Sequence, residues 1–233
     1  MKENKYDDDI FFQKYSQMSR SQQGLAGAGE WETLRKLLPD FKDKRVLDLG
    51  CGYGWHCIYA MEHGASSVVG VDISHKMLEV AKEKTHFPQV EYKCCAIEDV
   101  EFPEESFDVI LSSLAFHYVA DYEILVKKIY RILKSGGKLV FTVEHPVFTA
   151  YGTQDWYYNE KGEILHFPVD NYYYYEGKRT AVFLGEKVTK YHRTLTTYLN
   201  TLLSNGFIIN HIVEPQPPEY MTVSYTHLTL PTN

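Results

Sequence analysis

The residues that could do chemistry begin with a short glycine-rich stretch. An apolar run at residues 46–49 contains Asp48, and glycines follow at positions 50, 52 and 54. Glycine has no Cβ, so such a loop can bend sharply and let a ligand lie against bare backbone. A loop that binds pyrophosphate offers N–H groups that favour anions, and a carboxylate beside it would repel that ligand. Asp48 therefore favours a cationic ligand for this loop.

A second acidic residue, Asp72, follows the next apolar run, at residues 67–71. Neighbouring parallel strands end at one edge of a sheet, so this carboxylate is expected beside the glycine loop. In dinucleotide folds an acid at this place accepts hydrogen bonds from a ribose hydroxyl, and an adenosyl ribose needs the same partner. Asp72 is therefore a candidate ribose ligand, and the alternative role is N-capping of the helix that follows.

The elements that must position these residues are read from apolar runs bounded by turn signals. The expected strands lie near residues 45–49, 67–71, 90–94, 107–112, 138–143 and 207–213. Helical patterns cover residues 55–63, 121–133 and 191–203, and a further helix runs to Lys84 from Ser74 as its N-cap. Strands that alternate with helices predict an α/β fold with a doubly wound, mostly parallel sheet.

Two segments outside this alternation are expected to cover the ligand edge. Residues 11–38 predict two helices separated by a Ser/Gln/Gly-rich break at residues 19–24. Residues 146–190 are too long for a plain connector and too apolar for disorder, so they predict a lid insertion. Tyrosines stand at positions 157, 158 and 172–175 in this lid, which makes it the expected determinant of specificity.

Four segments, in order, resemble the motifs of class I S-adenosylmethionine-dependent methyltransferases, in particular small-molecule enzymes of the type 11 group. They are VLDLGCGYG at 46–54, VGVDIS at 69–74, SFDVILSSLAFHYV at 106–119 and LKSGGKLVFTVEHP at 133–146. The resemblance covers about residues 44–145. It implies a Rossmann-like, mostly parallel seven-stranded sheet with an N-terminal helical cap and a lid. It also implies S-adenosyl-L-methionine as the methyl donor and S-adenosyl-L-homocysteine as the product.

The resemblance also implies a set of donor-binding residues. Asp48 would orient the loop and the donor's methionyl amino group, and Met77 would pack on the adenine. An aspartate usual in the family for reading adenine is replaced by Ala96, so the backbone of Ile97 and the side chain of Glu98 are expected instead. The expected donor-binding residues are Asp48, Gly50, Cys51, Gly52, Gly54, Asp72, Ile73, Met77, Ile97, Glu98, Ser113, Tyr15 and Arg20.

Three residues are candidates for chemistry on the methyl acceptor. His117 follows the fourth strand, and its ordinary pKa near 6.5 suits a base at neutral pH. Glu144 and His145 follow the fifth strand at the same edge and could orient the acceptor. The alternative roles are a donor-pocket or helix-capping histidine for His117 and loop hydrogen bonding for the other two.

The expected organisation has five parts. They are a helical cap at residues 1–43, a donor-binding core at 44–145, a lid at 146–190, a helix and strand at 191–223 that complete the sheet, and a tail at 224–233. The tail looks foreign to the family. Only residues 222–230 are left to form the family's seventh strand, so that strand is in doubt.

Composition excludes several classes of function. The chain has 233 residues, 44% of them hydrophobic, and a net charge of −7, which gives no general attraction to nucleic acid. No apolar run approaches the roughly 18 residues of a membrane span, and the polar start does not resemble a secretory leader, so a cytoplasmic location is expected. The cysteines at 51, 57, 94 and 95 match no zinc or disulfide spacing, so no metal is expected.

The sequence therefore predicts transfer of a methyl group from S-adenosylmethionine to an oxygen, nitrogen or carbon nucleophile of a small molecule. A non-catalytic domain that binds the donor and regulates a partner is the first alternative. An NAD-dependent dehydrogenase is the second, although its loop would favour a GxGxxG pattern and no acid at Asp48. The sequence leaves the acceptor and the oligomeric state open.

Overall fold

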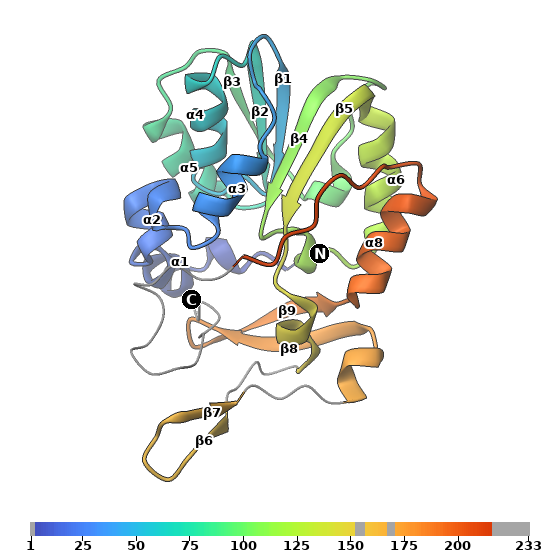
Figure 1. Ribbon diagram of the computed structural model, residues 1–233. Helices are drawn as coiled ribbons and strands as arrows, with labels where there is room; N and C mark the ends of the chain where they lie inside the picture. Colours follow the sequence, from blue (N-terminus) through green and yellow to red (C-terminus); the bar gives the residue numbers. More distant parts are fainter. Residues whose placement is uncertain (1–2, 152–156, 167–170, 216–233) are drawn as a thin grey trace.

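The computed structural model describes residues 3–151, 157–166 and 171–215 (Figure 1). Its centre is a five-stranded sheet in the order β3-β2-β1-β4-β5, in which every neighbouring pair is parallel. The strands are β1 (Arg45–Leu49), β2 (Ser67–Asp72), β3 (Val90–Cys94), β4 (Phe107–Ser113) and β5 (Leu133–Thr142). The carboxyl ends of all five strands therefore share one edge, as the α/β prediction requires.

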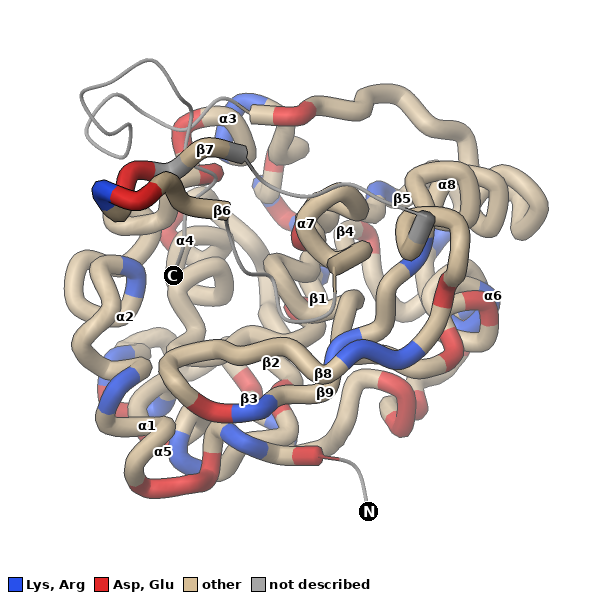
Figure 2. The backbone as a smooth tube through the Cα atoms, turned by 90° about the horizontal axis from the view of Figure 1, so that it is seen from below, with Lys and Arg blue, Asp and Glu red and all other residues tan. Residues whose placement is uncertain are grey.

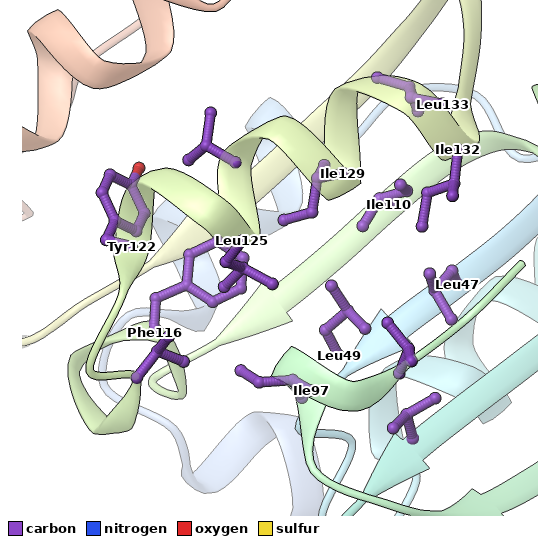
Figure 3. Close-up of a cluster of buried hydrophobic side chains, with 14 of the residues drawn as sticks. Leu47, Leu49, Ile97, Ile110, Phe116, Tyr122, Leu125, Ile129, Ile132 and Leu133 are labelled. Carbon is purple, nitrogen blue, oxygen red and sulfur yellow. The ribbon is translucent and has the colours of Figure 1, made fainter. Parts of the chain in front are cut away.

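Helices cover both faces of the sheet (Figure 1). Three of them begin and end within one residue of the predicted positions: α4 (Trp55–Glu62), α5 (His75–Lys84) and α6 (Tyr122–Ile132). Helices α4 and α5 contribute to the buried cluster on one face, and α6 to the larger cluster on the other. Figure 3 shows Leu125 and Ile129 of α6 lying over Leu49 and Ile110 of the sheet.

Ser74 is the N-cap of α5, as predicted. Its Oγ accepts a hydrogen bond from the Met77 N–H at 3.1 Å and donates to Asp7 Oδ1 at 2.6 Å. We expect Ser74→Ala to lower the free energy of unfolding by about 1 kcal/mol, because the N–H at Met77 would lose its partner. Urea denaturation measures this change. Thr85→Ala, just after the C-terminus of the same helix, is a control for the loss of a hydroxyl outside the N-cap, and an unchanged midpoint for Ser74→Ala would contradict the prediction.

Short helices at the N-terminus form the cap. They are η1 (Lys5–Asp7), α1 (Asp9–Ser16), α2 (Ser19–Gln23), η2 (Gly24–Gly27) and α3 (Trp31–Leu37). The predicted break at residues 19–24 is wrong, because most of it forms α2. The chain turns before α2, at residues 17–18, and again at Gly24, whose φ is 64°. Serine and glutamine are tolerated in an exposed helix, so a polar run alone does not define a loop.

Residues 146–192, which include the predicted lid, contain several regular helices and strands. They form α7 (Pro146–Ala150), β6 (Tyr157–Tyr158), β7 (Ile164–His166), η5 (Asn171–Tyr174), β8 (Gly177–Phe183) and β9 (Glu186–His192). Strands β8 and β9 pair as an antiparallel hairpin that lies across the carboxyl ends of the sheet (Figures 1 and 2). The smaller β6–β7 hairpin extends away from the rest of the molecule (Figure 1).

The cap and the β8–β9 hairpin share a small hydrophobic core. Phe11 of α1 is fully buried against Ala181 of β8 and Val188 of β9. The Lys14 ammonium donates to the Leu184 carbonyl at 2.9 Å, and Glu3 accepts from the backbone N–H of Thr189. The first and the later parts of the chain therefore form one cover over the sheet edge.

The predicted helix at 191–203 starts too early, because residues 191 and 192 belong to β9 and helix α8 spans Leu195–Ser204. The predicted strand at 207–213 is wrong, because the structure assigns no strand there. The sheet accordingly has five strands among the described residues instead of seven. The candidate seventh strand at 222–230 and the tail at 224–233 lie outside the described residues.

The side chains at 207–213 explain why they resemble a strand. Phe207 and Ile209 pack against the main core, whereas Ile208 is 84% exposed. This alternation reflects burial on one side of an extended segment, and it does not require hydrogen bonds to a neighbouring strand.

No helix in the described part of the chain is long and apolar enough to cross a membrane.

Candidate functional site

The loop after β1 is shaped by the backbone of β2. The N–H groups of Gly50 and Cys51 donate to the Val71 carbonyl at 2.8 and 2.9 Å. Gly50, Gly52 and Gly54 have φ values of 81°, 52° and 74°, which residues with a Cβ rarely adopt. A Cβ on Gly52 would meet no atom within 4 Å. The loop therefore presents bare backbone to open space.

Asp48 lies beneath this loop and is 1% exposed. Its Oδ2 accepts a hydrogen bond from Cys57 Sγ at 3.5 Å, and its Oδ1 has no hydrogen-bond partner among the described residues. Burial raises the pKa of Asp48 to about 7, and the charge of Asp72 adds to the effect. A buried oxygen without a partner is costly, and a cationic ligand group would supply one. The arrangement fits a positively charged ligand.

Asp72 connects the loop to the start of α5. Its Oδ2 accepts from the Gly52 N–H and its Oδ1 from the Ser74 N–H, both at 2.9 Å. Burial raises its pKa as well. Each carboxylate oxygen can accept a second hydrogen bond, so ligand hydroxyls could bind while the loop stays braced. The geometry is compatible with ribose binding, whereas the alternative role of N-cap is filled by Ser74.

The other expected donor-binding residues lie after β2, in α5 and in the loop after β3, and their surroundings differ. Ile73 follows Asp72, and its carbonyl accepts from Asn4 Nδ2 at 3.2 Å. Met77 is buried in the first turn of α5. Ile97, in η3 (Ile97–Asp99), belongs to the main hydrophobic cluster, and the Glu98 carbonyl accepts from Lys128 Nζ at 2.8 Å. Ile73 and Met77 thus lie just after the carboxyl end of β2, close to Asp72, while Ile97 contributes to the hydrophobic core.

The cap brings Tyr15 and Arg20 to the same edge. Arg20 forms an ion pair with Glu30, whose Oε1 also lies 3.4 Å from the Ser113 hydroxyl at the end of β4. Tyr15 makes an edge-to-face contact with Tyr53 of the glycine loop, with ring centroids 5.9 Å apart. Glu30 is a site residue that the sequence did not single out, because a lone acid in a cap helix has no distinctive pattern.

The acceptor candidates lie at the ends of β4 and β5. His117, in η4 (Phe116–Tyr118), is 1% exposed; its Nδ1 accepts from the Glu144 N–H at 3.4 Å, and burial lowers its pKa to about 4. Its Nε2 is 3.9 Å from Glu144 Oε1. His145 instead caps α7 by accepting from the Val147 N–H, and its other nitrogen lies 2.6 Å from Glu214. The structure therefore brings His117 and Glu144 together and gives His145 a capping role.

Lys190 of β9 is a further charged residue at this edge, and it is only 2% exposed. It forms an ion pair with Glu144 and lies beside the ring of Tyr118. The Tyr118 hydroxyl is 3.3 Å from that of Tyr6 in the cap. Val188, Lys190 and His192 alternate along β9, and all three side chains are buried. This alternation was the sequence signal that Lys190 faces inward. It was missed because a lysine in a strand is ordinarily assigned to the exposed face.

A cavity of about 1260 Å³ runs along the outer side of β5. Helix α8 and residues 206–215 line its far side, and Arg20, Glu30 and Glu144 line the end nearest the site. Residues 207–213, which were predicted to form a strand, therefore border this cavity instead.

The chain matches known proteins over most of its length. Residues 47–141 match the family described as "Methyltransferase domain". An uncharacterised protein of Haemophilus influenzae is 37% identical over 223 residues, which cover 90% of this chain and 85% of that one.

Two crystal structures are similar to this one over most of their length. A candidate S-adenosylmethionine-dependent methyltransferase from Listeria monocytogenes is 57% identical, with a TM-score of 0.79 and coverage of 83% of this chain and 90% of that one. An S-adenosylmethionine-dependent methyltransferase from Mesorhizobium loti is 40% identical, with a TM-score of 0.78 and coverage of 85% and 90%.

Proposed function

Since the chain belongs to the S-adenosylmethionine-dependent methyltransferase family, we propose that it transfers the donor's methyl group to an oxygen, nitrogen or carbon nucleophile of a small-molecule acceptor. S-Adenosylmethionine is the cosubstrate that this family uses. The observation that carries the proposal is the buried Oδ1 of Asp48 beneath the glycine loop, which has no hydrogen-bond partner in the described part of the chain. A sulfonium nucleoside with an amino group satisfies that oxygen.

The donor, when bound, supplies a methyl group on a positively charged sulfur. Transfer to a nucleophile is an in-line displacement, so the protein must align the reactants about 3 Å apart and exclude water. Asp48 is assigned to the amino group, Asp72 to the ribose hydroxyls and Arg20 to the carboxylate. The cap residues Tyr6 and Tyr15, which are half-buried near the Asp72 carboxylate, would help to exclude water.

The acceptor is proposed to be a small molecule because the lid closes over the edge where it must bind. The β8–β9 hairpin and α1 cover that edge from two sides and share a core around Phe11. A macromolecular acceptor would need a more open approach to the ends of β4 and β5. The net charge of −7 also disfavours an RNA acceptor.

The direct test is a metabolite extract incubated with the protein and a donor that carries an isotopically labelled methyl group. We expect labelled small molecules that are missing when Asp72→Ala protein is used. Binding of S-adenosylhomocysteine without any labelled product would instead favour the regulatory domain. A larger increase in the protein's melting temperature with NAD(H) than with S-adenosylhomocysteine would favour the dehydrogenase.

Asp72→Ala is expected to raise the dissociation constant of S-adenosylhomocysteine by about tenfold or more. The ribose would lose a charge-assisted hydrogen bond, worth about 1.5–3 kcal/mol, and the Gly52 N–H would lose its brace. Isothermal titration calorimetry measures the change, and Asp40→Ala, on an exposed turn away from the site, is the control. An affinity equal to that of the unaltered protein would remove Asp72 from the donor site.

A further inference from the structure

Glu144, His117 and Lys190 come from three different elements and meet at the ends of β4 and β5. Lys190 and Glu144 form an ion pair, and His117 Nε2 lies 3.9 Å from the same Glu144 oxygen. The Lys190 ammonium is 5.9 Å from the ring centroid of Tyr118 and 5.4 Å from that of Phe183. A buried cation, a carboxylate and two aromatic rings thus lie together at the ends of β4 and β5.

His117 is poorly suited to take a proton there. Its Nδ1 accepts the Glu144 N–H at 3.4 Å, so the neutral ring carries its own hydrogen on Nε2. Neither nitrogen is then available as a proton acceptor. His145 is occupied in a similar way, by the Val147 N–H on one nitrogen and Glu214 on the other. Glu144 differs from both histidines because its carboxylate has two oxygens with about four acceptor positions, so it can accept a proton while it is paired with Lys190.

We propose that Glu144 accepts the proton of the methyl acceptor, that Lys190 is the positioning residue that keeps Glu144 ionised and oriented, and that the acceptor presents an acidic hydroxyl of the phenol or enol type. This inference rests on the proposed methyltransferase function. Glu144 also lines the cavity beside β5, and its side chain is 20% exposed.

The step balances in atoms and charge. The acceptor O–H bond breaks and its proton goes to a Glu144 oxygen, while the acceptor oxygen forms a bond to the methyl carbon. The bond between that carbon and sulfur breaks, and its electron pair stays on sulfur, which becomes a neutral thioether. The products are a methyl ether, S-adenosylhomocysteine and a protonated Glu144 that later returns its proton to solvent.

The ion pair determines which hydroxyls can react. A carboxylate that is paired with an ammonium is a weak base, so it can assist only a hydroxyl that is itself acidic, such as a phenol with a pKa near 10. A neutral amine could attack without giving up a proton first and would not need this group.

Several titratable or charged groups face Glu144 from the elements around it. They are His117 and Tyr118 of η4, Lys190 of β9, Arg193 of the following loop and Tyr198 of α8. Tyr118 and Tyr198 stay protonated at neutral pH because burial raises the pKa of both, and His117 stays neutral. Lys190, which contacts Glu144 directly, is therefore the group whose removal should move the pH dependence of the reaction.

The test compares Glu144→Gln, Lys190→Met, Lys190→Arg and the double variant with Gln and Met. Each is incubated with labelled donor and the metabolite extract, and the labelled product is followed against pH. Binding of S-adenosylhomocysteine is measured for every variant. The double variant removes both charges together. If its melting temperature is higher than that of a single variant, the single variant was destabilised by the one buried charge that was left without its partner.

Support would consist of four results. Glu144→Gln lowers the rate at least about 100-fold, as expected for loss of a proton acceptor, while its affinity for S-adenosylhomocysteine stays within about threefold of that of the unaltered protein. Lys190→Met moves the acid limb of the rate profile up by about one pH unit, because a carboxylate without its ammonium binds a proton more readily. Lys190→Arg restores the original limb. The label is found on oxygen.

Four results would overturn the inference. An unshifted acid limb in Lys190→Met, or a Glu144→Gln rate within threefold of the unaltered protein, would remove the proton role while leaving methyl transfer intact. A label on nitrogen would remove the hydroxyl assignment. No labelled product from the unaltered protein, despite binding of the donor, would overturn the proposed function and this inference with it.

Discussion

Asp48→Asn should weaken binding of S-adenosylhomocysteine by about 100-fold and at the same time stabilise the unliganded protein at pH 8. The loss of affinity follows from replacing a carboxylate, assigned here to the amino group, with a neutral amide; a charge-assisted hydrogen bond is worth about 1.5–3 kcal/mol. The gain in stability follows because the amide is not ionised and is far less costly to bury. Calorimetry measures the first effect and thermal denaturation the second.

The stability gain should depend on pH. The pKa of Asp48 is about 7 in the folded protein and 3.8 by its ordinary value. As pH rises from 4 to 7, the unfolded chain loses this proton before the folded protein does, so stability falls with pH over that interval, by at most about 4 kcal/mol. Asp48→Asn should therefore gain little at pH 4 and most at pH 8. A gain that is the same at both pH values would contradict the assigned pKa.

Donor binding should carry the same signature. A cationic group that contacts Asp48 favours its ionised form, so binding at pH 6 should release a proton from the unaltered protein and none from Asp48→Asn. Titrations in buffers with different enthalpies of ionisation would count that proton. Equal proton release from both proteins would place the donor's amino group elsewhere.

Gly50→Ala should lower the free energy of unfolding by about 2–5 kcal/mol and abolish donor binding. The φ of 81° costs a residue with a Cβ about 1–2 kcal/mol, and the new Cβ would lie 2.5 Å from the Cβ of Ala115, which adds about 1–3 kcal/mol. Urea denaturation checks the first effect. Adding Ala115→Gly should recover the part due to the contact and leave the part due to φ.

Gly52→Ala is the matched control within the same loop. It shares the positive φ, at 52°, but its Cβ would meet no atom within 4 Å. We therefore expect a loss of stability of only about 1 kcal/mol, with a larger effect on donor binding because the Cβ would enter the space beside the loop. Equal destabilisation by the two substitutions would show that the contact with Ala115 does not matter.

The loop geometry on which the proposed donor site depends could be predicted from the sequence, because it follows from local rules. An acid and spaced glycines after a buried strand define the loop, and the end of the next strand fixes Asp72. Ser74 is identifiable as an N-cap by its place before an amphipathic pattern, and its hydrogen bond to Met77 confirms that prediction. These features depend on residues close together in the chain.

The cluster that we propose as the acceptor end could not be predicted in the same way, because it is assembled by distant segments. Lys190 meets Glu144 only after a hairpin folds back across the sheet, and no spacing in the sequence records that contact. Tyr6 reaches Tyr118 from the opposite end of the chain. The predicted strand at 207–213 was wrong for a related reason: apolar alternation reports which side is buried, and pairing depends on a partner strand.

The buried contact of Phe11 with Ala181 and Val188 has a consequence for the catalytic cycle. Because one small core joins the two halves of the cover, neither half can lift alone without exposing a phenylalanine to water. We therefore expect the spent nucleoside and the methylated compound to leave in a single opening event. The temperature dependence of turnover should then be steep, as for the transient unfolding of a small cooperative unit.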